Sequence, residues 1–349
     1  MTKTNAGNFF EDFRIGQELV HATPRTVTSG DVALYTALYG TRFALQSSDA
    51  FAQSLGLPRA PVDDLLVFHI VFGKTVPDVS LNAIANLGYA ECRFGASVYP
   101  GDTLSTRSVV IGLRENSNRE SGVVHVRSTG RNQHGEVVLD YVRWVMVRKR
   151  DPKAELPVAV TPKLAPAVAA SDLVVPAGLS LGSYDAQLAG ATHRWRDYDI
   201  GERVDHVDGM TIEEAEHMIA TRLYQNTAKV HFDQRLAAGS RFGRRLIYGG
   251  HIISLARALS FNGLANALRL AAINAGSHTN PTLAGDTIYA WSEVTDKAEL
   301  AHRTDVGALR LRTLAVKNAP SSAFPDKSAD GRTDPAVVLD LDYWVLMPR

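Results

Sequence analysis

The sequence contains an internal repeat. When the chain is aligned with itself at an offset of 185 residues, residues 12–16 (DFRIG) fall on residues 197–201 (DYDIG) without a gap, and His21 falls on His206. Further pairs follow in the same order, with small shifts from loop insertions: Leu38-Tyr39 with Leu223-Tyr224, Gly101-Asp102-Thr103 with Gly285-Asp286-Thr287, and Trp144 with Trp344. A repeat of this length predicts a duplicated domain and not a solenoid of short units.

The repeat divides the 349 residues into two halves and a connecting segment. We predict an N-terminal domain at residues 1–150, a linker at residues 151–190 and a C-terminal domain at residues 191–349. The linker is rich in proline and alanine and has little amphipathic period, which is typical of a semi-rigid, extended connection. Such a segment is able to lie along the surface and tie the two halves together.

Both halves show the same order of expected elements. A short strand comes first, and a helix follows, with start signals at Thr28 and at a capping-box pair of Thr211 and Glu214. A second, apolar helix is expected at residues 64–74 and 250–264. Strands are then expected at residues 98–110, 122–131 and 137–147, and at 287–295, 309–316 and 336–347. Helices followed by a run of antiparallel strands indicate the α+β class.

Composition narrows the classes of function. The 37 Lys and Arg residues balance 37 Asp and Glu residues, so the net charge argues against a nucleic acid or an anionic membrane as the main partner. The single cysteine, Cys92, excludes an intrachain disulfide and a cysteine-based metal site. No apolar stretch is long enough to span a bilayer, and the N-terminus has no signal-peptide pattern, so we expect a cytoplasmic protein.

One segment of the second half resembles a known catalytic signature. Residues 224–231 (YQNTAKVH) and the step at residues 247–250 (IYGG) are similar to the motif of the R-specific enoyl-CoA hydratases, the MaoC-like hot-dog family. That motif has an aspartate five residues before a histidine, and later an aliphatic-His-Gly step that opens a central helix. Asn226 stands at the aspartate position here, and Tyr248 stands at the histidine of the later step. The first half keeps the frame but has Thr41, Gln46 and Asp63-Asp64 at the matching positions.

The resemblance covers both halves. It implies a double hot-dog fold, in which each half wraps an antiparallel sheet around a long helix and the two sheets join edge to edge. Four further segments, at residues 9–13, 21–26, 65–76 and 142–150, resemble the mesaconyl-CoA hydratase branch of the family. This implies reversible dehydration of (2R,3S)-β-methylmalyl-CoA to mesaconyl-CoA in a bacterial acetyl-CoA assimilation route. It further implies a CoA thioester as the small-molecule partner, no metal or other cofactor, and a homodimer or higher homo-oligomer.

The hydratase chemistry assigns roles to the motif residues. Hydration of an enoyl thioester needs a base for the water, an acid for Cα and donors for the thioester oxygen. We expect His231 to move protons and the backbone N–H groups of Gly249 and Gly250 to hold the oxygen, with Tyr248 in the substrate-binding wall. Asn226 is not a base; it orients the water or is simply an Asx-turn residue.

Several assignments stay open at this stage. The second carboxylate that replaces the family aspartate is Asp63 or Asp233, or His231 works alone; Asp63 and Asp64 also suit the role of a helix N-cap. The resemblance implies a dicarboxylic monothioester as substrate, and Arg257 is a candidate clamp for its free carboxylate. By contrast, Arg143 is interpreted as an exposed residue of the last strand of its half. Two other functions remain as alternatives, a hot-dog thioesterase and a non-catalytic acyl-CoA-binding protein.

Overall fold

A single antiparallel sheet forms the back of the molecule. The computed structural model describes residues 3–154 and 158–349, and in these residues the sheet has 11 strands in the order β1-β3-β4-β5-β2-β8-β11-β10-β9-β6, with β7 paired to β9. The first half supplies β1 (Glu18–Thr26), β2 (Ala83–Phe94), β3 (Thr103–Glu115), β4 (Ser121–Arg131) and β5 (Val137–Arg148). The second half supplies β6 (Arg203–Asp205), β7 (Met210–Thr211), β8 (Arg269–Ser277), β9 (Thr287–Glu299), β10 (Val306–Lys317) and β11 (Val337–Pro348).

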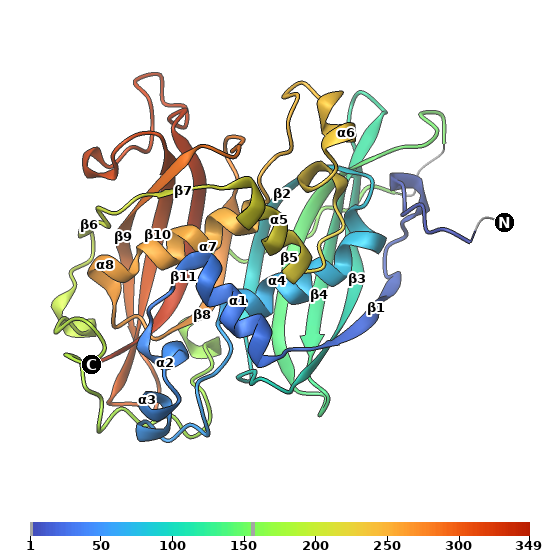
Figure 1. Ribbon diagram of the computed structural model, residues 1–349. Helices are drawn as coiled ribbons and strands as arrows, with labels where there is room; N and C mark the ends of the chain where they lie inside the picture. Colours follow the sequence, from blue (N-terminus) through green and yellow to red (C-terminus); the bar gives the residue numbers. More distant parts are fainter. Residues whose placement is uncertain (1–2, 155–157) are drawn as a thin grey trace.

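The two halves join through β2 and β8. These strands pair antiparallel, with Tyr89 opposite Gly276 and Cys92 opposite Ile273, so the sheet is continuous across the repeat (Figure 1). The edge-to-edge joining of the two sheets is therefore confirmed. The sequence patterns did not indicate either of these two strands, although the six others expected from them are present with shifted ends.

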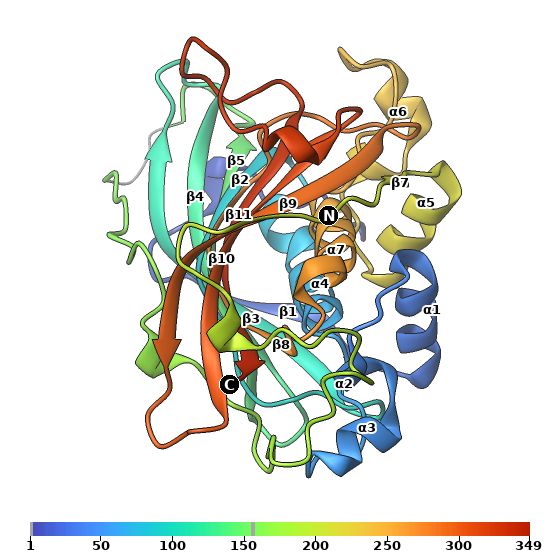
Figure 2. The same cartoon turned by 90° about the vertical axis from the view of Figure 1, so that its left-hand side faces the viewer.

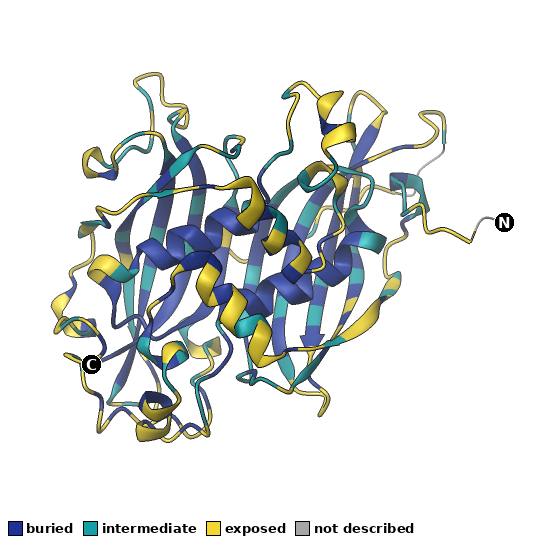
Figure 3. Ribbon diagram, viewed as in Figure 1, coloured by how far each residue is buried: buried dark blue, intermediate teal, exposed yellow. Residues whose placement is uncertain are grey.

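Helices cover one face of this sheet, as the turned view in Figure 2 shows. The first half contributes α1 (Ser29–Tyr39), α2 (Ala44–Ser47), α3 (Asp49–Ser54) and α4 (Asp64–Thr75); the second contributes α5 (Glu214–Leu223), α6 (Gln234–Ala238), α7 (Gly249–Leu259) and α8 (Phe261–Leu264). Helices α4 and α7 lie against the sheet, and α1 and α5 lie over them. Every residue of α4 is buried, whereas α1 and α5 expose their outer faces (Figure 3).

The local signals at the helix ends were partly right. Thr28 caps α1, because its hydroxyl accepts the Asp31 N–H at 3.1 Å and the Asp31 carboxylate accepts the Thr28 N–H at 2.8 Å. The capping box predicted for α5 is wrong, since Thr211 lies in β7 and pairs with β9. The predicted helix 250–264 ends early, because Asn262 and Gly263 have non-helical dihedral angles.

The described parts of the linker, residues 151–154 and 158–190, run along both halves. Val160 forms a β-bridge with Leu113 of β3, and the carbonyl of Val168 accepts the indole N–H of Trp344 at 3.1 Å. Leu179 and Tyr184 are buried in an apolar cluster with residues of α3 and β10. The linker therefore ties the halves together, as its composition allowed.

No helix in the described residues is long and apolar enough to cross a membrane.

Candidate active site

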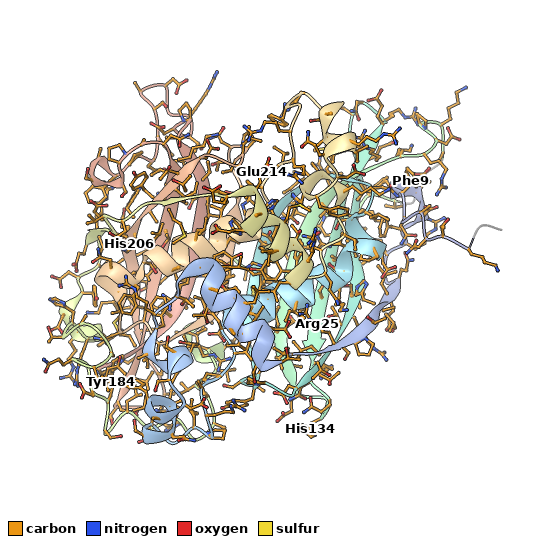
Figure 4. The ribbon with its side chains drawn as sticks, viewed as in Figure 1. Phe9, Arg25, His134, Tyr184, His206 and Glu214 are labelled. Atoms are coloured by element: carbon orange, nitrogen blue, oxygen red, sulfur yellow. The ribbon has the colours of Figure 1, made fainter. Side chains whose placement is uncertain are left out.

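The segment that links α5 to α7, residues 224–248, is held against the first half of the molecule. The carbonyl of Tyr224 lies so close to Gly73 of α4 that a Cβ there would be 2.0 Å from its oxygen. Next to it, the ammonium of Lys74 donates to the side chain of Gln225, and the guanidinium of Arg25 (labelled in Figure 4) donates to the carbonyl of Leu223. The segment with the hydratase-like motif therefore belongs to the second half in sequence but rests on the first.

His231 lies in this segment, at the end of a short 3₁₀ turn (Lys229–His231). Its Nδ1–H donates to the carbonyl of Leu246 at 2.9 Å, so the neutral ring has Nε2 as its unprotonated atom. Burial lowers the pKa of His231 to about 4, because the charged imidazolium is poorly solvated there. The ring therefore stays neutral at physiological pH and is able to take a proton at Nε2.

The start of α7 lies beside His231. The ring of Tyr248, the N-cap residue of the helix, is 5.5 Å from the ring of His231 between centroids. Gly249 and Gly250 form the first turn, where backbone N–H groups have no acceptor within the helix. Both positions need glycine: a Cβ on Gly249 would lie 2.4 Å from the His278 ring, and one on Gly250 would lie 2.4 Å from the Tyr248 ring. Two free N–H groups and the positive end of a helix dipole thus face the site.

A buried network of histidine, tyrosine and serine side chains lies behind this site. His217 of α5, which the sequence analysis missed, accepts the N–H of Tyr248 at Nε2, 2.8 Å away, and its ring is 6.1 Å from that of His231. A hydrogen bond of 2.8 Å joins Tyr39 to His251, and one of 2.9 Å joins His69 to Ser254. Burial lowers the pKa of His69 and of His251 to about 3, so both are neutral structural residues.

Asn226 and Asp233 both take part in local backbone structure. The side-chain oxygen of Asn226 accepts the Ala228 N–H at 3.0 Å, which is the Asx-turn alternative, and its amide Nδ2 has no acceptor in the described residues. The carboxylate of Asp233 caps α6 by accepting the Leu236 N–H at 3.0 Å. Neither side chain forms a hydrogen bond with His231 in the described part of the chain. The geometry therefore gives His231 no carboxylate partner from its own segment.

Asp63 and Asp64 lie at the start of α4 in the first half, and Arg257 lies near the end of α7 in the second half. Asp63 caps α4 through the Leu65 N–H at 2.9 Å, and burial raises its pKa. Asp64 forms an ion pair with Arg269 at 3.0 Å. Arg257 lies eight residues after Gly249, about 12 Å further along α7. Its guanidinium lies 3.6 Å from the Phe43 ring centroid. The structure therefore does not bring Asp63 or Arg257 to His231.

Two further residues near the start of α7 escaped the sequence analysis. His278 follows β8, packs against Gly249 and forms a hydrogen bond of 3.2 Å with Tyr89 of β2. Arg143 was interpreted as exposed, and this is wrong, because its exposed fraction is 0%. Arg143 is the strand partner of Tyr89 in the β2–β5 pair, so both side chains leave the sheet on the same face. Arg143 is in step with the buried apolar residues Tyr141, Val145 and Val147, so the alternation along β5 is the signal that could have shown its direction.

Chemically, the site combines a neutral base with an anion-binding helix start. Nε2 of His231 can accept a proton from water, and the N–H groups of Gly249 and Gly250 can hold an oxygen that gains negative charge. In residues 3–154 and 158–349, no cluster of three or more His, Cys, Asp or Glu side chains has the arrangement of a metal site. Proton transfer and oxyanion stabilisation are the chemistry that these groups support.

Comparison with known proteins places this site in a family. A family model described as mesaconyl-CoA hydratase matches residues 1–327. The chain is 68% identical over 347 residues to a β-methylmalyl-CoA dehydratase of Chloroflexus aurantiacus, covering 99% of both chains. It is 64% identical over 347 residues to a mesaconyl-CoA hydratase of Cereibacter sphaeroides, covering 99% of this chain and 100% of that one.

Solved structures agree with the double hot-dog architecture. A crystal structure of a MaoC domain protein from Chloroflexus aurantiacus superposes with a TM-score of 0.98 at 67% identity, covering 100% of this chain and 99% of that one. A Mycobacterium tuberculosis protein described as having a double hotdog fold superposes with a TM-score of 0.75 at 26% identity, covering 98% and 99% of the two chains. The α+β class predicted from the order of elements and the double hot-dog fold implied by the resemblance are both confirmed. The chain belongs to the mesaconyl-CoA hydratase family of MaoC-like enzymes.

Proposed function

We propose that this protein is a hydro-lyase that interconverts (2R,3S)-β-methylmalyl-CoA and mesaconyl-CoA. The observation that carries the proposal is the position of His231. Its Nδ1–H is bound to the Leu246 carbonyl, which leaves Nε2 as a free base beside the first turn of α7. The two relatives with more than 60% identity are named for the two directions of this reaction.

One residue, His231, is enough for both proton transfers of the hydration step. In the hydration direction, Nε2 of His231 takes a proton from water while the water oxygen bonds to Cβ of the enoyl thioester. The electron pair of the double bond moves toward the thioester carbonyl, whose oxygen gains negative charge between the N–H groups of Gly249 and Gly250. The imidazolium of His231 then returns the proton to Cα. No carboxylate is needed, which suits a site in which Asn226 takes the place of the family aspartate.

The low pKa of His231 supports this cycle. Because burial lowers the pKa to about 4, the imidazolium formed after attack is a stronger acid than a free histidine. It is therefore well suited to return its proton to carbon. The same shift keeps the ring in its base form above about pH 5. We propose that the reaction uses no metal or redox cofactor, since proton transfer and hydrogen bonding supply the whole step.

A two-channel assay tests this function. Purified enzyme, dialysed against EDTA, is mixed with mesaconyl-CoA while enoyl-thioester absorbance and free thiol are recorded together. A hydratase removes the absorbance without releasing thiol, a thioesterase releases thiol, and a binding protein does neither. Replacement His231→Ala is expected to lower the hydration rate by at least about 100-fold, the usual contribution of a general acid–base group. Activity of His231→Ala within a few-fold of wild type would remove the assignment.

Assembly and location complete the proposal. We propose a homodimer or higher homo-oligomer that works in the cytoplasm on a CoA thioester, without nucleic acid or membrane as a partner. The neutral balance of charged residues supports this set of partners.

A further inference from the structure

Arg143 is a buried cation without a counter-ion. Its Nη2 donates to the hydroxyls of Thr75 at 2.7 Å and of Ser80 at 3.3 Å. Its Nε and Nη1 are buried and have no hydrogen-bond partner in the described residues. The guanidinium also lies 4.2 Å from the ring centroid of Phe72, and cation–π attraction offsets part of the loss of hydration. A buried guanidinium with two unused donors is costly unless an anion binds there.

The surroundings of Arg143 place it on the same side of the molecule as the candidate site. The Phe72 ring, on which the guanidinium lies, is 5.8 Å from the Tyr248 ring, and the Tyr248 ring is 5.5 Å from that of His231. On the other side, its strand partner Tyr89 is hydrogen bonded to His278, whose ring packs on Gly249. Two independent sets of contacts therefore connect Arg143 to the start of α7.

A second buried atom without a partner lies in this region. Nδ1 of His278 has no hydrogen-bond partner in the described residues, although Nε2 of the same ring is bound to Tyr89. Unsatisfied buried polar atoms are rare in folded proteins. Those of Arg143 and His278 both lie next to Tyr89, which is the strand partner of Arg143 and the hydrogen-bond partner of His278, so together they suit a ligand with negatively charged oxygen atoms.

We propose that Arg143 binds the free carboxylate of the substrate and so selects dicarboxylic CoA thioesters. This inference rests on the proposed function for the identity of the thioester. In a four-carbon diacid the two carboxyl carbons are about 4 Å apart, from ordinary bond lengths. In this proposal, the thioester oxygen binds at Gly249 and Gly250, and the carboxylate on Cβ binds at Arg143. The unused Nε and Nη1 are the pair of donors that bind a carboxylate in a bidentate manner.

The contrast with Arg257 supports the choice of Arg143. Arg257 is also buried, over Phe43, and its Nη1 has no hydrogen-bond partner in the described residues. However, although burial lowers the pKa of Arg257, the carboxylates of Asp63 and Asp64 oppose this shift, together with Tyr343 and Tyr35. The groups with this effect on Arg143 are tyrosines only: Tyr141, Tyr89 and Tyr248. Arg257 is thus compensated within the protein, whereas Arg143 lacks an acidic group that a substrate carboxylate would supply.

Equilibrium binding of unreactive analogues tests the clamp. Methylsuccinyl-CoA has the substrate carboxylate but no double bond, and 2-methylbutyryl-CoA has a methyl group in place of the carboxylate. In Arg143→Met we expect the dissociation constant of methylsuccinyl-CoA to rise by about 100-fold, and that of 2-methylbutyryl-CoA to change by less than about three-fold. Because neither analogue reacts, the result does not depend on hydratase turnover. A failure of the proposed function would appear only in the mesaconyl-CoA assay.

A matched control variant is Arg127→Met. Arg127 lies on the neighbouring strand β4, and it forms ion pairs with Glu91 and Asp140 away from the candidate site. The Arg127→Met variant should leave the dissociation constants of both analogues unchanged. Equal weakening of both analogues by Arg143→Met, or no weakening of methylsuccinyl-CoA, would overturn the proposal.

The thermal stability of Arg143→Met is a second measurement, and it distinguishes a substrate-binding arginine from one that only stabilises the fold. Removal of an uncompensated buried charge by Met should leave the thermal midpoint of the free enzyme unchanged or raise it. If Arg143→Met does not fold, Arg143→Lys tests the same point. It keeps the charge but loses the bidentate geometry, so it should weaken methylsuccinyl-CoA binding by about 10-fold and leave 2-methylbutyryl-CoA unaffected. Wild-type discrimination in Arg143→Lys and a lower midpoint in Arg143→Met would together indicate a structural residue.

Discussion

At the scale of single residues, the site depends on the absence of one side chain. Gly249 has the His278 ring where a Cβ would be, and the Tyr89 hydroxyl holds that ring in place. The substitution Gly249→Ala should therefore displace either the ring or the first turn of α7, moving an N–H group away from the thioester oxygen. We expect kcat/KM with mesaconyl-CoA to fall by about 100-fold, the usual loss for one oxyanion donor, as measured by enoyl-thioester absorbance.

The control for this variant is the same substitution in another helix. Gly30 of α1 has no heavy atom closer than 3.5 Å to the position of a Cβ. Gly30→Ala should leave kcat/KM unchanged and stabilise the protein by up to about 1 kcal/mol through helix propensity. If Gly249→Ala kept the wild-type kcat/KM, the backbone N–H groups at the start of α7 would not be the oxyanion donors.

Sequence reasoning found some residues of the site and missed others for a physical reason. His231, Gly249 and Gly250 lie in one continuous segment with motif spacing, so their grouping is visible before any fold is known. Arg143 and His278 come from β5 and from the end of β8, and only the pairing across the seam brings them to the same helix start. The alternation along β5 places Arg143 on the buried face with Tyr141 and Val145, but the alternation alone does not show which side chains of other strands lie beside it.

At the scale of elements, the catalytic segment depends on a glycine in a helix of the other half. Gly73 lies near the end of α4, where an added Cβ would be 2.0 Å from the carbonyl oxygen of Tyr224. Gly73→Ala should lift the segment from α4 at a cost of about 1–3 kcal/mol, as in other overpacked sites. We expect faster proteolysis within residues 225–248 and a lower hydration rate, although no residue of the active site is changed.

The readout for this variant is limited proteolysis with mass analysis of the fragments, compared between Gly73→Ala, Gly30→Ala and wild type. The Gly30→Ala protein should match wild type in cleavage of the segment. Unchanged cleavage in Gly73→Ala would mean that the contact of α4 with Tyr224 does not hold the segment down.

The two strands that the sequence analysis missed are the ones that join the halves. β2 (AIANLGYAECRF) and β8 (RLAAINAGS) are rich in alanine, asparagine and glycine, which have low strand propensity. Their pairing is imposed by the sheet and the helices around them and not by local preference. Strands with β-branched residues in alternation, such as β5 and β11, were predicted within a few residues of their observed ends.

At the scale of the whole molecule, two copies of one domain form one candidate site. Gln46 matches His231 in the repeat but donates its amide to the Leu268 carbonyl at 2.9 Å. Asp64 matches Gly249, and its carboxylate forms an ion pair with Arg269 and accepts the Leu270 N–H at 3.1 Å. In the first half, the Asp64 side chain thus lies at the start of the helix, where the second half has glycine and no side chain. The first half instead contributes α4, Gly73 and Arg143 to the surroundings of the site in the second half.

The buried histidines also set the response of the whole molecule to pH. Four of them are at most 2% exposed, and burial lowers their pKa to about 3 for His69, 4 for His206, 2 for His217 and 3 for His251. In the unfolded chain they titrate near 6.5, so below that pH the unfolded state binds protons that the folded state does not. The free energy of unfolding should therefore be constant above about pH 7. As the pH falls below about 6, it should decrease by up to about 1.4 kcal/mol per pH unit for each histidine.

Urea unfolding at pH 7.5, 6.5 and 5.5 tests this dependence. Two carboxylates act in the opposite direction: burial raises the pKa of Asp63, and it raises that of Asp64 to about 6, so the folded state gains protons there as the pH falls. Burial also lowers the pKa of His231 and of His278 to about 4, so the histidines outnumber the two carboxylates and leave a net loss of stability. This loss should appear as a lower midpoint urea concentration at pH 5.5 with little change in the slope m. A second series with His251→Phe should show a shallower decrease, because one neutral buried histidine is removed. An unchanged midpoint between pH 7.5 and 5.5 would mean that the histidine network takes up protons while folded.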